Sequence, residues 1–438
     1  MNYALLKSRN KNRYIYDGHG NSFFRILDES LTSEEINAFI DAKRPKNRLF
    51  AIDAPSHAKK LATIDARSLV VEVTERCNLR CAYCTYGKAS KKNRSHSDRS
   101  IDPNIARAEI RNFLGRCKAD PSISYYGGEP LLEFDLIKQL SEYAKGLSPN
   151  KVRFGVTSNG LLLKGGVIDY LVENQFELII SIDGNEEIND AARHFGKGKN
   201  TSVWKILTRN LTALIQRFPD YYRTNISFHC VITDFGKIDS ICDFFNTCTL
   251  TADNQILFSF EEEYREKHQV QIAYLKRVIK TANLPLDYDN LNAFDREFIY
   301  GPIKDIEERE IGEGLYENIR VCSPFRNRTF VRSNGEVQIC ERVGRKYTRV
   351  KPENLGRNAY EVMNELVKFY LKQCSNCYAY HFCGLCPASF IDERGHLNSK
   401  KRESECAFMK EKLQLLLTLF ISNKEAEACS AKDTQSLT

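Results

Sequence analysis

The stretch CNLRCAYC, from Cys77 to Cys84, holds three cysteines with three and then two residues between them. It follows the apolar run SLVVEVT at residues 68–74, which is typical of a buried strand. The cysteines would therefore lie on a loop at the carboxyl end of a strand, where α/β folds place their chemistry. Three such thiolates can each bind one iron of a four-iron cluster and leave the fourth iron open. A structural zinc site is the simpler alternative.

The composition sets outer bounds on the class of protein. The chain of 438 residues is long enough for two or three domains. It contains no uninterrupted apolar run of membrane-spanning length and no extended apolar core near its first residue, so we expect a cytoplasmic protein without a membrane partner. Fifteen cysteines in a reducing compartment are more natural as metal ligands than as disulfides. A net charge of +7 is too diffuse to indicate nucleic acid.

Strands and helices alternate over residues 67–262, which predicts an α/β domain with a parallel sheet. The predicted strands lie at 68–74, 122–126, 152–156, 177–182, 225–232 and 255–260. The helical patterns lie at 102–117, 134–146, 164–174, 201–217 and 236–246.

The second predicted strand ends in Gly127-Gly128-Glu129-Pro130. Two glycines let a backbone approach a ligand closely, and a neighbouring carboxylate can accept hydrogen bonds from an ammonium group. This strand end is therefore a candidate binding site for a small molecule.

Short polar side chains end the next two strands, namely Ser158 with Asn159 and Ser181 with Asp183. Such groups suit ribose hydroxyls and a carboxylate. Arg193 lies a little further along, and a guanidinium can clamp a carboxylate with two hydrogen bonds.

With these motifs in this order, the chain resembles the radical S-adenosylmethionine (radical SAM) enzymes. In that family the methionine part of the cofactor chelates the open iron, and the reduced cluster cleaves the cofactor to a 5′-deoxyadenosyl radical. The resemblance implies a partial (β/α)6 TIM-like barrel, with Cys77, Cys81 and Cys84 on the cluster. A histidine is more usual where Asn189 stands. The implied cofactor-binding residues are Tyr83, Gly127, Gly128, Glu129, Pro130, Ser158, Asn159, Ser181, Asp183 and Arg193.

A second group of cysteines lies in residues 321–421, at Cys322, Cys340, Cys374, Cys377, Cys383, Cys386 and Cys406. The paired CxxC units alone would favour a zinc ribbon. After a radical SAM barrel, the pattern instead resembles the SPASM extension, a C-terminal cysteine-rich domain with two auxiliary four-iron clusters. The resemblance implies three [4Fe-4S] clusters in all. One auxiliary cluster would use Cys374, Cys377, Cys383 and Cys406, and the other Cys322, Cys340 and Cys386.

Two features of this region depart from the family or leave a choice open. Only two residues separate Cys383 from Cys386, where relatives often have three, and no further cysteine follows Cys322 closely. Glu341 stands where the anaerobic sulfatase maturases have an aspartate that acts as general base. It is therefore a candidate catalytic residue, or else a surface glutamate packed against Arg342 or Arg345.

The remaining segments flank these two regions. Residues 1–66 are expected to form a hairpin at 12–26 and a short helix opened by a Thr32/Glu35 capping box. This segment resembles the opening of radical SAM maturases that modify peptides, where it helps to hold the precursor; a cap over one end of the barrel is the alternative. Residues 263–320 are expected to be bridging helices, and residues 422–438 a disordered tail.

These features together predict a radical SAM/SPASM maturase of a ribosomally synthesised precursor peptide. It would form an oxidised or cross-linked product of the cyclophane or thioether type, with electrons from a donor such as flavodoxin or ferredoxin. The run CYAYHFC at 377–383 looks like that subgroup. Formylglycine formation of the sulfatase type is the alternative enzymatic function, and a zinc-binding adaptor is the alternative of another class.

Overall fold

The structure is a computed structural model of the 438-residue chain. It describes residues 3–18, 20–28, 30–43, 66–87, 94–118, 120–196, 201–251, 253–261, 266–309, 328–342, 355–374, 377–391 and 396–435. Among these residues, no helix combines the length and the apolar character that crossing a membrane requires.

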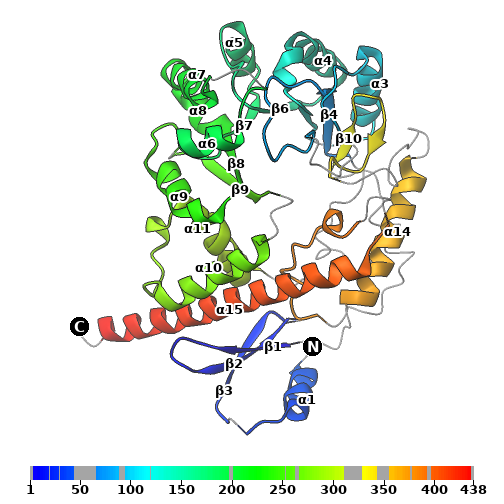
Figure 1. The fold of residues 1–438 in the computed structure, drawn as a ribbon. Helices are drawn as coiled ribbons and strands as arrows, with labels where there is room; N and C mark the ends of the chain where they lie inside the picture. The colour runs from blue at the N-terminus through cyan, green and yellow to red at the C-terminus, as the bar shows by residue number, and fades with distance from the viewer. Residues whose placement is uncertain are drawn as a thin grey trace.

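A sheet of eight strands in the order β11-β10-β4-β5-β6-β7-β8-β9 forms the centre of the molecule (Figure 1). Strands β4 to β9 are parallel, each paired with the next along the chain, so the six predicted strands are confirmed. They are β4 (Ser68–Thr74), β5 (Ser122–Gly127), β6 (Arg153–Ser158), β7 (Glu177–Ser181), β8 (Ile226–Ile232) and β9 (Gln255–Phe260).

Helices lie along the outer face of this sheet (Figure 1). They bury one apolar stripe each, as α4 does with Ile137, Leu140 and Ala144, and Asp102 and Ser202 cap the first turns of α3 and α7. The helices are α3 (Pro103–Leu114), α4 (Phe134–Leu147), α5 (Gly166–Glu173), α6 (Glu186–Ala192), α7 (Val203–Arg217), α8 (Pro219–Asn225) and α9 (Ile238–Thr247).

The hairpin of β10 (Thr329–Val331) and β11 (Val337–Gln338) extends the sheet beyond β4. Strand β10 runs parallel to β4, a pairing that the sequence did not predict. Arg332, directly after β10, is buried and lies 3.8 Å from Glu72 and 3.4 Å from Glu75. This buried ion network fixes the second cysteine region to the strand that carries the first cysteines.

The second half of the chain is mainly helical, as expected for residues 263–320 over their described part. Its helices are α10 (Lys267–Thr281), α11 (Ala293–Asp295), the π-helix Arg296–Tyr300, α12 (Gly301–Glu308), α14 (Leu355–Cys374) and α15 (Ser399–Gln435). The prediction of a disordered tail was wrong for residues 422–435, because α15 continues through them. Ser422 and Asn423 are buried there, and Asn423 accepts a hydrogen bond from the Leu286 amide at 2.6 Å.

An N-terminal unit precedes the barrel and consists of β1 (Tyr3–Lys7), β2 (Arg13–Asp17), β3 (Ser22–Ile26) and α1 (Ser33–Lys43). The predicted hairpin is confirmed as β2 and β3, whereas β1 was not predicted. The capping box is also confirmed: Thr32 N donates to Glu35 at 2.8 Å, and Glu35 N donates to the Thr32 hydroxyl at 3.2 Å. The unit has a small core of its own, made of Tyr3, Ile15, Ile36 and Ile40.

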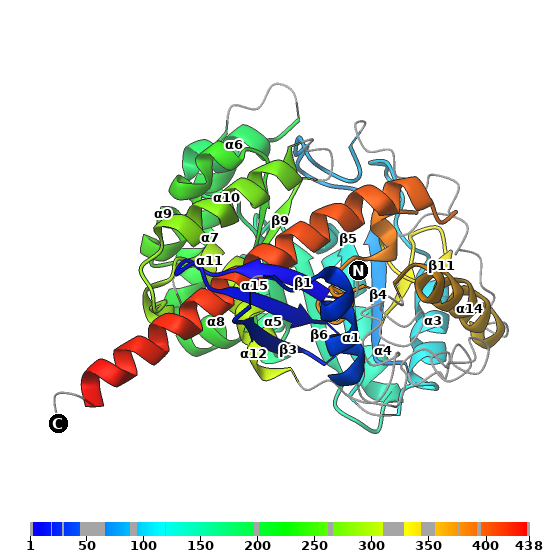
Figure 2. The same ribbon diagram turned by 90° about the horizontal axis from the view of Figure 1, so that it is seen from below.

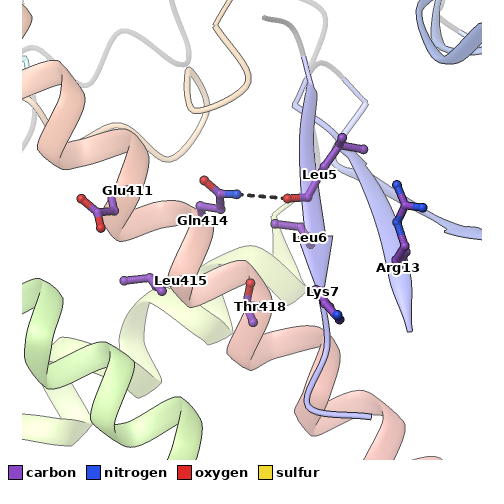
Figure 3. Close-up of a pocket in the computed structure, with 8 residues that line it drawn as sticks. All are labelled: Leu5, Leu6, Lys7, Arg13, Glu411, Gln414, Leu415 and Thr418. Atoms are coloured by element: carbon purple, nitrogen blue, oxygen red, sulfur yellow. Dashed lines mark hydrogen bonds between the residues drawn. The ribbon is translucent and has the colours of Figure 1, made fainter. Parts of the chain in front are cut away.

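The N-terminal unit packs on α15, on the side away from the main sheet, so it does not cap the barrel (Figures 1 and 2). Glu425 of α15 accepts hydrogen bonds from Asn12 at 2.7 Å and from Tyr14 at 2.6 Å, and the rings of Phe23 and Phe420 lie 5.3 Å apart. A pocket of about 460 Å³ remains between β1 and α15, where Gln414 donates to the Leu5 carbonyl at 3.0 Å (Figure 3).

Candidate active site

The first three cysteines lie on the loop that leaves the carboxyl end of β4. Backbone bonds hold this loop against the end of α6: Arg80 N donates to His194 O at 2.8 Å and Ala82 N to Ala192 O at 2.9 Å. The loop is thus fixed between β4 and the segment that carries Arg193.

The three thiols are partly enclosed and close enough to influence one another. Burial raises the pKa of Cys77 to about 12 and raises the pKa of Cys81 and Cys84 as well. A thiolate in such a place needs a cationic partner, which a metal centre provides. In the part of the chain that the structure describes, no three His, Cys, Asp or Glu side chains close around one point as a single ion requires. Three thiols on one loop can each bind one iron of a cluster.

Gly127 and Gly128 bring the end of β5 against the chain that leads into the cysteine loop. A Cβ at Gly127 would lie 2.1 Å from Thr74 O, and one at Gly128 would lie 2.2 Å from Arg76 O. Gly128 N and Glu129 N donate to these two carbonyls at 2.9 and 2.8 Å. The close approach that the glycines permit in the structure is therefore to the cysteine loop.

Glu129 is fully buried between the ends of β5 and β6. Its carboxylate accepts hydrogen bonds from the Ser158 hydroxyl and the Asn159 backbone N–H, both at 2.8 Å, and from the Leu131 backbone N–H at 3.1 Å. Burial raises the pKa of Glu129, and these hydrogen bonds oppose that shift. Pro130 starts a 3₁₀ turn (Pro130–Glu133) that Glu129 caps.

The structure therefore brings together the residues predicted at the ends of the second and third strands. The Ser158 hydroxyl is occupied with Glu129, so this serine positions the carboxylate. Asn159 Nδ2 donates to Asn78 at 2.7 Å and ties the end of β6 to the cysteine loop. Asn78 was not predicted as a site residue, because nothing in its local sequence marks it.

Tyr83 joins the cysteine loop to Asp183 and Arg193, both of which are almost fully buried. Arg193 donates to the Tyr83 hydroxyl at 2.8 Å, and that hydroxyl donates to Asp183 Oδ2 at 2.6 Å. Asp183 Oδ1 accepts from Val231 N at 2.9 Å, and Asn189 accepts from Asp183 N at 3.2 Å. Asn189 thus shapes this turn from the position where the family usually has histidine.

The guanidinium of Arg193 keeps one donor free. Its Nε is buried and has no hydrogen-bond partner among the described residues. Burial raises the pKa of Asp183, while the neighbouring Arg193 lowers it. Glu129 follows β5 and Arg193 follows α6, yet Arg193 is close enough to lower the pKa of Glu129. A buried carboxylate and a guanidinium donor placed in this way suit a ligand with one ammonium and one carboxylate group, such as the methionine part of SAM. The residues present fit the implied cofactor.

Glu341 lies at the end of the β10–β11 hairpin with its carboxylate divided between two environments. Oε1 pairs with Arg328 at 2.9 Å, whereas Oε2 is buried without a hydrogen-bond partner among the described residues. The Glu341 carbonyl accepts a hydrogen bond from Arg94, whose guanidinium lies over the rings of Tyr86 and Phe330. The Glu341 side chain thus pairs with Arg328, which the sequence did not suggest, whereas Arg345 lies outside the described residues.

In the second cysteine region, four thiols come near one another. Arg402 donates to Cys374 at 3.4 Å and to Cys406 at 4.0 Å, and Cys383 lies within electrostatic reach of Cys374, Cys377 and Cys406. These are the members of one predicted auxiliary set. Cys322 lies outside the described residues, so its set with Cys340 and Cys386 stays a prediction.

The family model of the radical SAM superfamily matches residues 71–224, the part of the chain that contains β4 to α8. The chain thus carries a radical SAM domain, the catalytic domain of an enzyme superfamily.

Curated proteins match shorter parts of the chain than its full length. The chain is 32% identical over 138 residues to an uncharacterized protein of Methanocaldococcus jannaschii. This match covers 31% of this chain and 45% of that protein. It is 25% identical over 143 residues to a cysteine-type anaerobic sulfatase-maturating enzyme of Clostridium novyi (32% and 38% covered). It is 21% identical over 208 residues to the radical SAM cyclopropyl synthase TigE of Paramaledivibacter caminithermalis (41% and 42%). The chain thus spans less than half the length of these relatives.

The fold is similar to that of the solved structure "Native anSMEcpe with bound AdoMet". The two agree with a TM-score of 0.57 at 20% identity, over 81% of this chain and 99% of the other. At this identity the likeness concerns the fold alone.

Proposed function

We propose that the protein is a radical SAM enzyme that oxidatively modifies or cross-links residues of a ribosomally synthesised precursor peptide. The product is of the cyclophane or thioether type, and flavodoxin or ferredoxin supplies electrons in the cytoplasm. One radical SAM cluster and two auxiliary clusters serve the reaction. The observation that supports a peptide substrate most directly is the surface of the N-terminal unit.

Exposed apolar side chains are concentrated on that unit. Among the described residues, seven large hydrophobic side chains are exposed, and four of them are Leu5, Leu27, Leu31 and Phe39 of the N-terminal unit. Leu27 is 85% exposed, and Leu27 and Leu31 flank the turn between β3 and α1. Phe39 packs edge-on against Phe24 of β3 at 5.0 Å. An apolar surface beside an exposed strand suits an extended peptide segment.

The chain's own residues have distinct tasks in this proposal. When bound, the cofactor pair supplies a 5′-deoxyadenosyl radical. Glu129 and Arg193 hold the two charged groups of the methionine part, and Tyr83 keeps the cysteine loop in register with Asp183. Oε2 of Glu341 is buried and has no hydrogen-bond partner in the described part of the chain, so it is placed to accept a proton that the substrate loses.

Formylglycine formation on a protein is the second candidate, because sulfatase-maturating enzymes are among the relatives in sequence. The two candidates differ in their substrate and in what the N-terminal unit does. Peptide maturation needs the unit as a docking surface, whereas a sulfatase maturase would act equally well without its exposed apolar residues.

Metal content tests the cofactor part of the proposal. Three clusters predict about 12 irons per chain after anaerobic reconstitution, and about 8 in the triple variant Cys77→Ala/Cys81→Ala/Cys84→Ala. Cys429→Ala, which removes an exposed thiol near the end of α15, is the control and should retain full iron. Zinc in the second cysteine region, with all iron lost in the triple variant, would contradict the auxiliary clusters.

Substrate assays test the choice of reaction. The reconstituted enzyme is incubated anaerobically with SAM, a reductant and peptides encoded by short reading frames beside its gene. We expect one peptide to lose the mass of two hydrogen atoms, and the yield to fall about tenfold or more in a Leu27→Ser/Phe39→Ser variant. Leu147→Ser, an exposed apolar residue at the end of α4, is the matched control. Modification of a sulfatase-derived peptide, equal in all variants, would favour the second candidate.

A further inference from the structure

His229 lies on the concave face of the barrel, the face turned away from the helices. Along β8 the side chains at Ile226, Phe228, Cys230 and Ile232 are buried and those between them are partly exposed. Cys230 points toward α9, because Cys242 of that helix is within its electrostatic reach. Side chains alternate along a strand, so His229 points the other way, into the barrel.

Ser259 of the neighbouring strand β9 holds one nitrogen of this imidazole. His229 Nε2 and Ser259 Oγ are 2.9 Å apart. The described residues give Nδ1 no hydrogen-bond partner. One side of the ring is therefore fixed while the other remains available to a ligand.

The ring lies beside the candidate cofactor site without being part of it. In the sheet His229 pairs with Ser181, and Ile182 N donates to His229 O at 3.1 Å. Two residues along, Val231 N binds Asp183. Burial lowers the pKa of His229, with Asp183 opposing the shift and Arg193 adding to it, so the ring is neutral near pH 7.

The order of the strands indicates which ligand the space around His229 would hold. The residues that fit the methionine part of the cofactor lie at or shortly after the ends of strands β5, β6 and β7, whereas β8 and β9 continue the sheet beyond them. A substrate must reach the cofactor from the part of the concave face that the cofactor leaves open. His229 and Ser259 are polar groups on those two strands.

We propose that the His229–Ser259 pair is a substrate-positioning site, in which Nδ1 hydrogen-bonds the target residue of the peptide beside the bound cofactor. The inference rests on the proposed function. The pair would select for a substrate with a polar group next to the modified carbon. Ser259 fixes the orientation of the His229 ring, so it positions the substrate only through His229.

Chemical footprinting tests the orientation of His229 without knowledge of the peptide. The cluster-loaded enzyme is treated anaerobically with diethylpyrocarbonate, which acylates accessible neutral imidazoles, and His229 modification is measured by mass spectrometry with and without SAM. We expect modification in both samples, and at least as much of it in Ser259→Ala, where Nε2 is no longer engaged by a hydroxyl. Absence of modification without SAM would show a closed face, and complete protection by SAM would make His229 a cofactor contact; either overturns the proposal.

Variants test the contact with substrate in the peptide assay described above. His229→Leu should raise the KM for the peptide about tenfold, the effect of one lost hydrogen bond, while its affinity for SAM stays within about twofold of the parent. His229→Gln, which keeps a polar group, should recover part of the loss, and the exposed His396→Gln is the control. An unchanged KM in His229→Leu would refute the substrate contact. If the parent enzyme modifies no peptide, the proposed function fails, and the footprint still decides whether His229 faces the open site.

Discussion

Replacing Tyr83 by phenylalanine would remove the hydroxyl that joins the cysteine loop to Asp183 and Arg193. The change deletes two hydrogen bonds of 2.6 and 2.8 Å and leaves a carboxylate and a guanidinium nitrogen buried without this partner. An unsatisfied buried polar group costs about 1–3 kcal/mol, and a charged one more. Asp183 and Arg193 still attract each other, so we expect a loss of roughly 2–5 kcal/mol in the free energy of unfolding.

The only tryptophan of the chain makes this loss measurable. Trp204 lies on α7 in the barrel, so its fluorescence during urea unfolding reports on that domain. The metal-free protein is compared under anaerobic, reducing conditions with Tyr143→Phe, which removes an exposed hydroxyl bonded to Arg111. That control should stay within about 0.5 kcal/mol of the parent. If Tyr83→Phe did the same, Tyr83 would not hold the loop to the barrel.

Three further predictions concern other parts of the structure. Arg332→Met removes the buried cation beside Glu72 and leaves Glu75 only the more exposed Arg99, at 3.9 Å, so it should cost about 3–5 kcal/mol by urea unfolding. Arg153→Met, at an exposed ion pair, should cost about 1 kcal/mol or less. Glu129→Gln places an amide against a backbone N–H and should weaken SAM binding more than tenfold in equilibrium dialysis of the reconstituted enzyme; equal affinity would remove Glu129 from the cofactor site. Burial raises the pKa of Glu425, but hydrogen bonds, the strongest from Tyr14, outweigh burial and lower this pKa below 4.5. The Glu425 carboxylate therefore stabilises docking of the N-terminal unit fully above pH 4.5, and this stabilisation is lost as the pH falls below 4.5. Hydrogen exchange in β1 and β2 should rise over that range in the parent and already be high near pH 7 in Glu425→Ala.

The barrel was predictable because parallel strands buried on both faces leave continuous apolar runs, as in SLVVEVT before Cys77. Strand β10 escaped prediction because three residues are too few to show a pattern, and it is a strand only through its pairing with β4. The helix over residues 422–435 was missed for a related reason. Its polar residues, such as Asn423, are buried against partners far away in the chain.

The candidate site, like the fold, could be predicted only in part from the sequence. Glu129, Asp183 and Arg193 belong to short motifs at strand ends and could be found from their order. Asn78 and His229 could not, since their roles depend on neighbours that are distant in sequence. The partner of Glu341 was also missed, because a carboxylate can reach any arginine that the fold brings near it, and the fold supplied Arg328.

The packing of the N-terminal unit on α15 has a consequence for biosynthesis. The unit is made before the helix that supports it, and at about 5–20 residues per second the chain between them takes about 20–80 s to make. During that time the core of Tyr3, Ile15, Ile36 and Ile40 can form. The hydrogen bond from Tyr14 to Glu425 and the ring contact of Phe23 with Phe420 can form only after α15 has been made. The nascent chain therefore exposes the Phe23 side of the unit until α15 has been made and has left the ribosome.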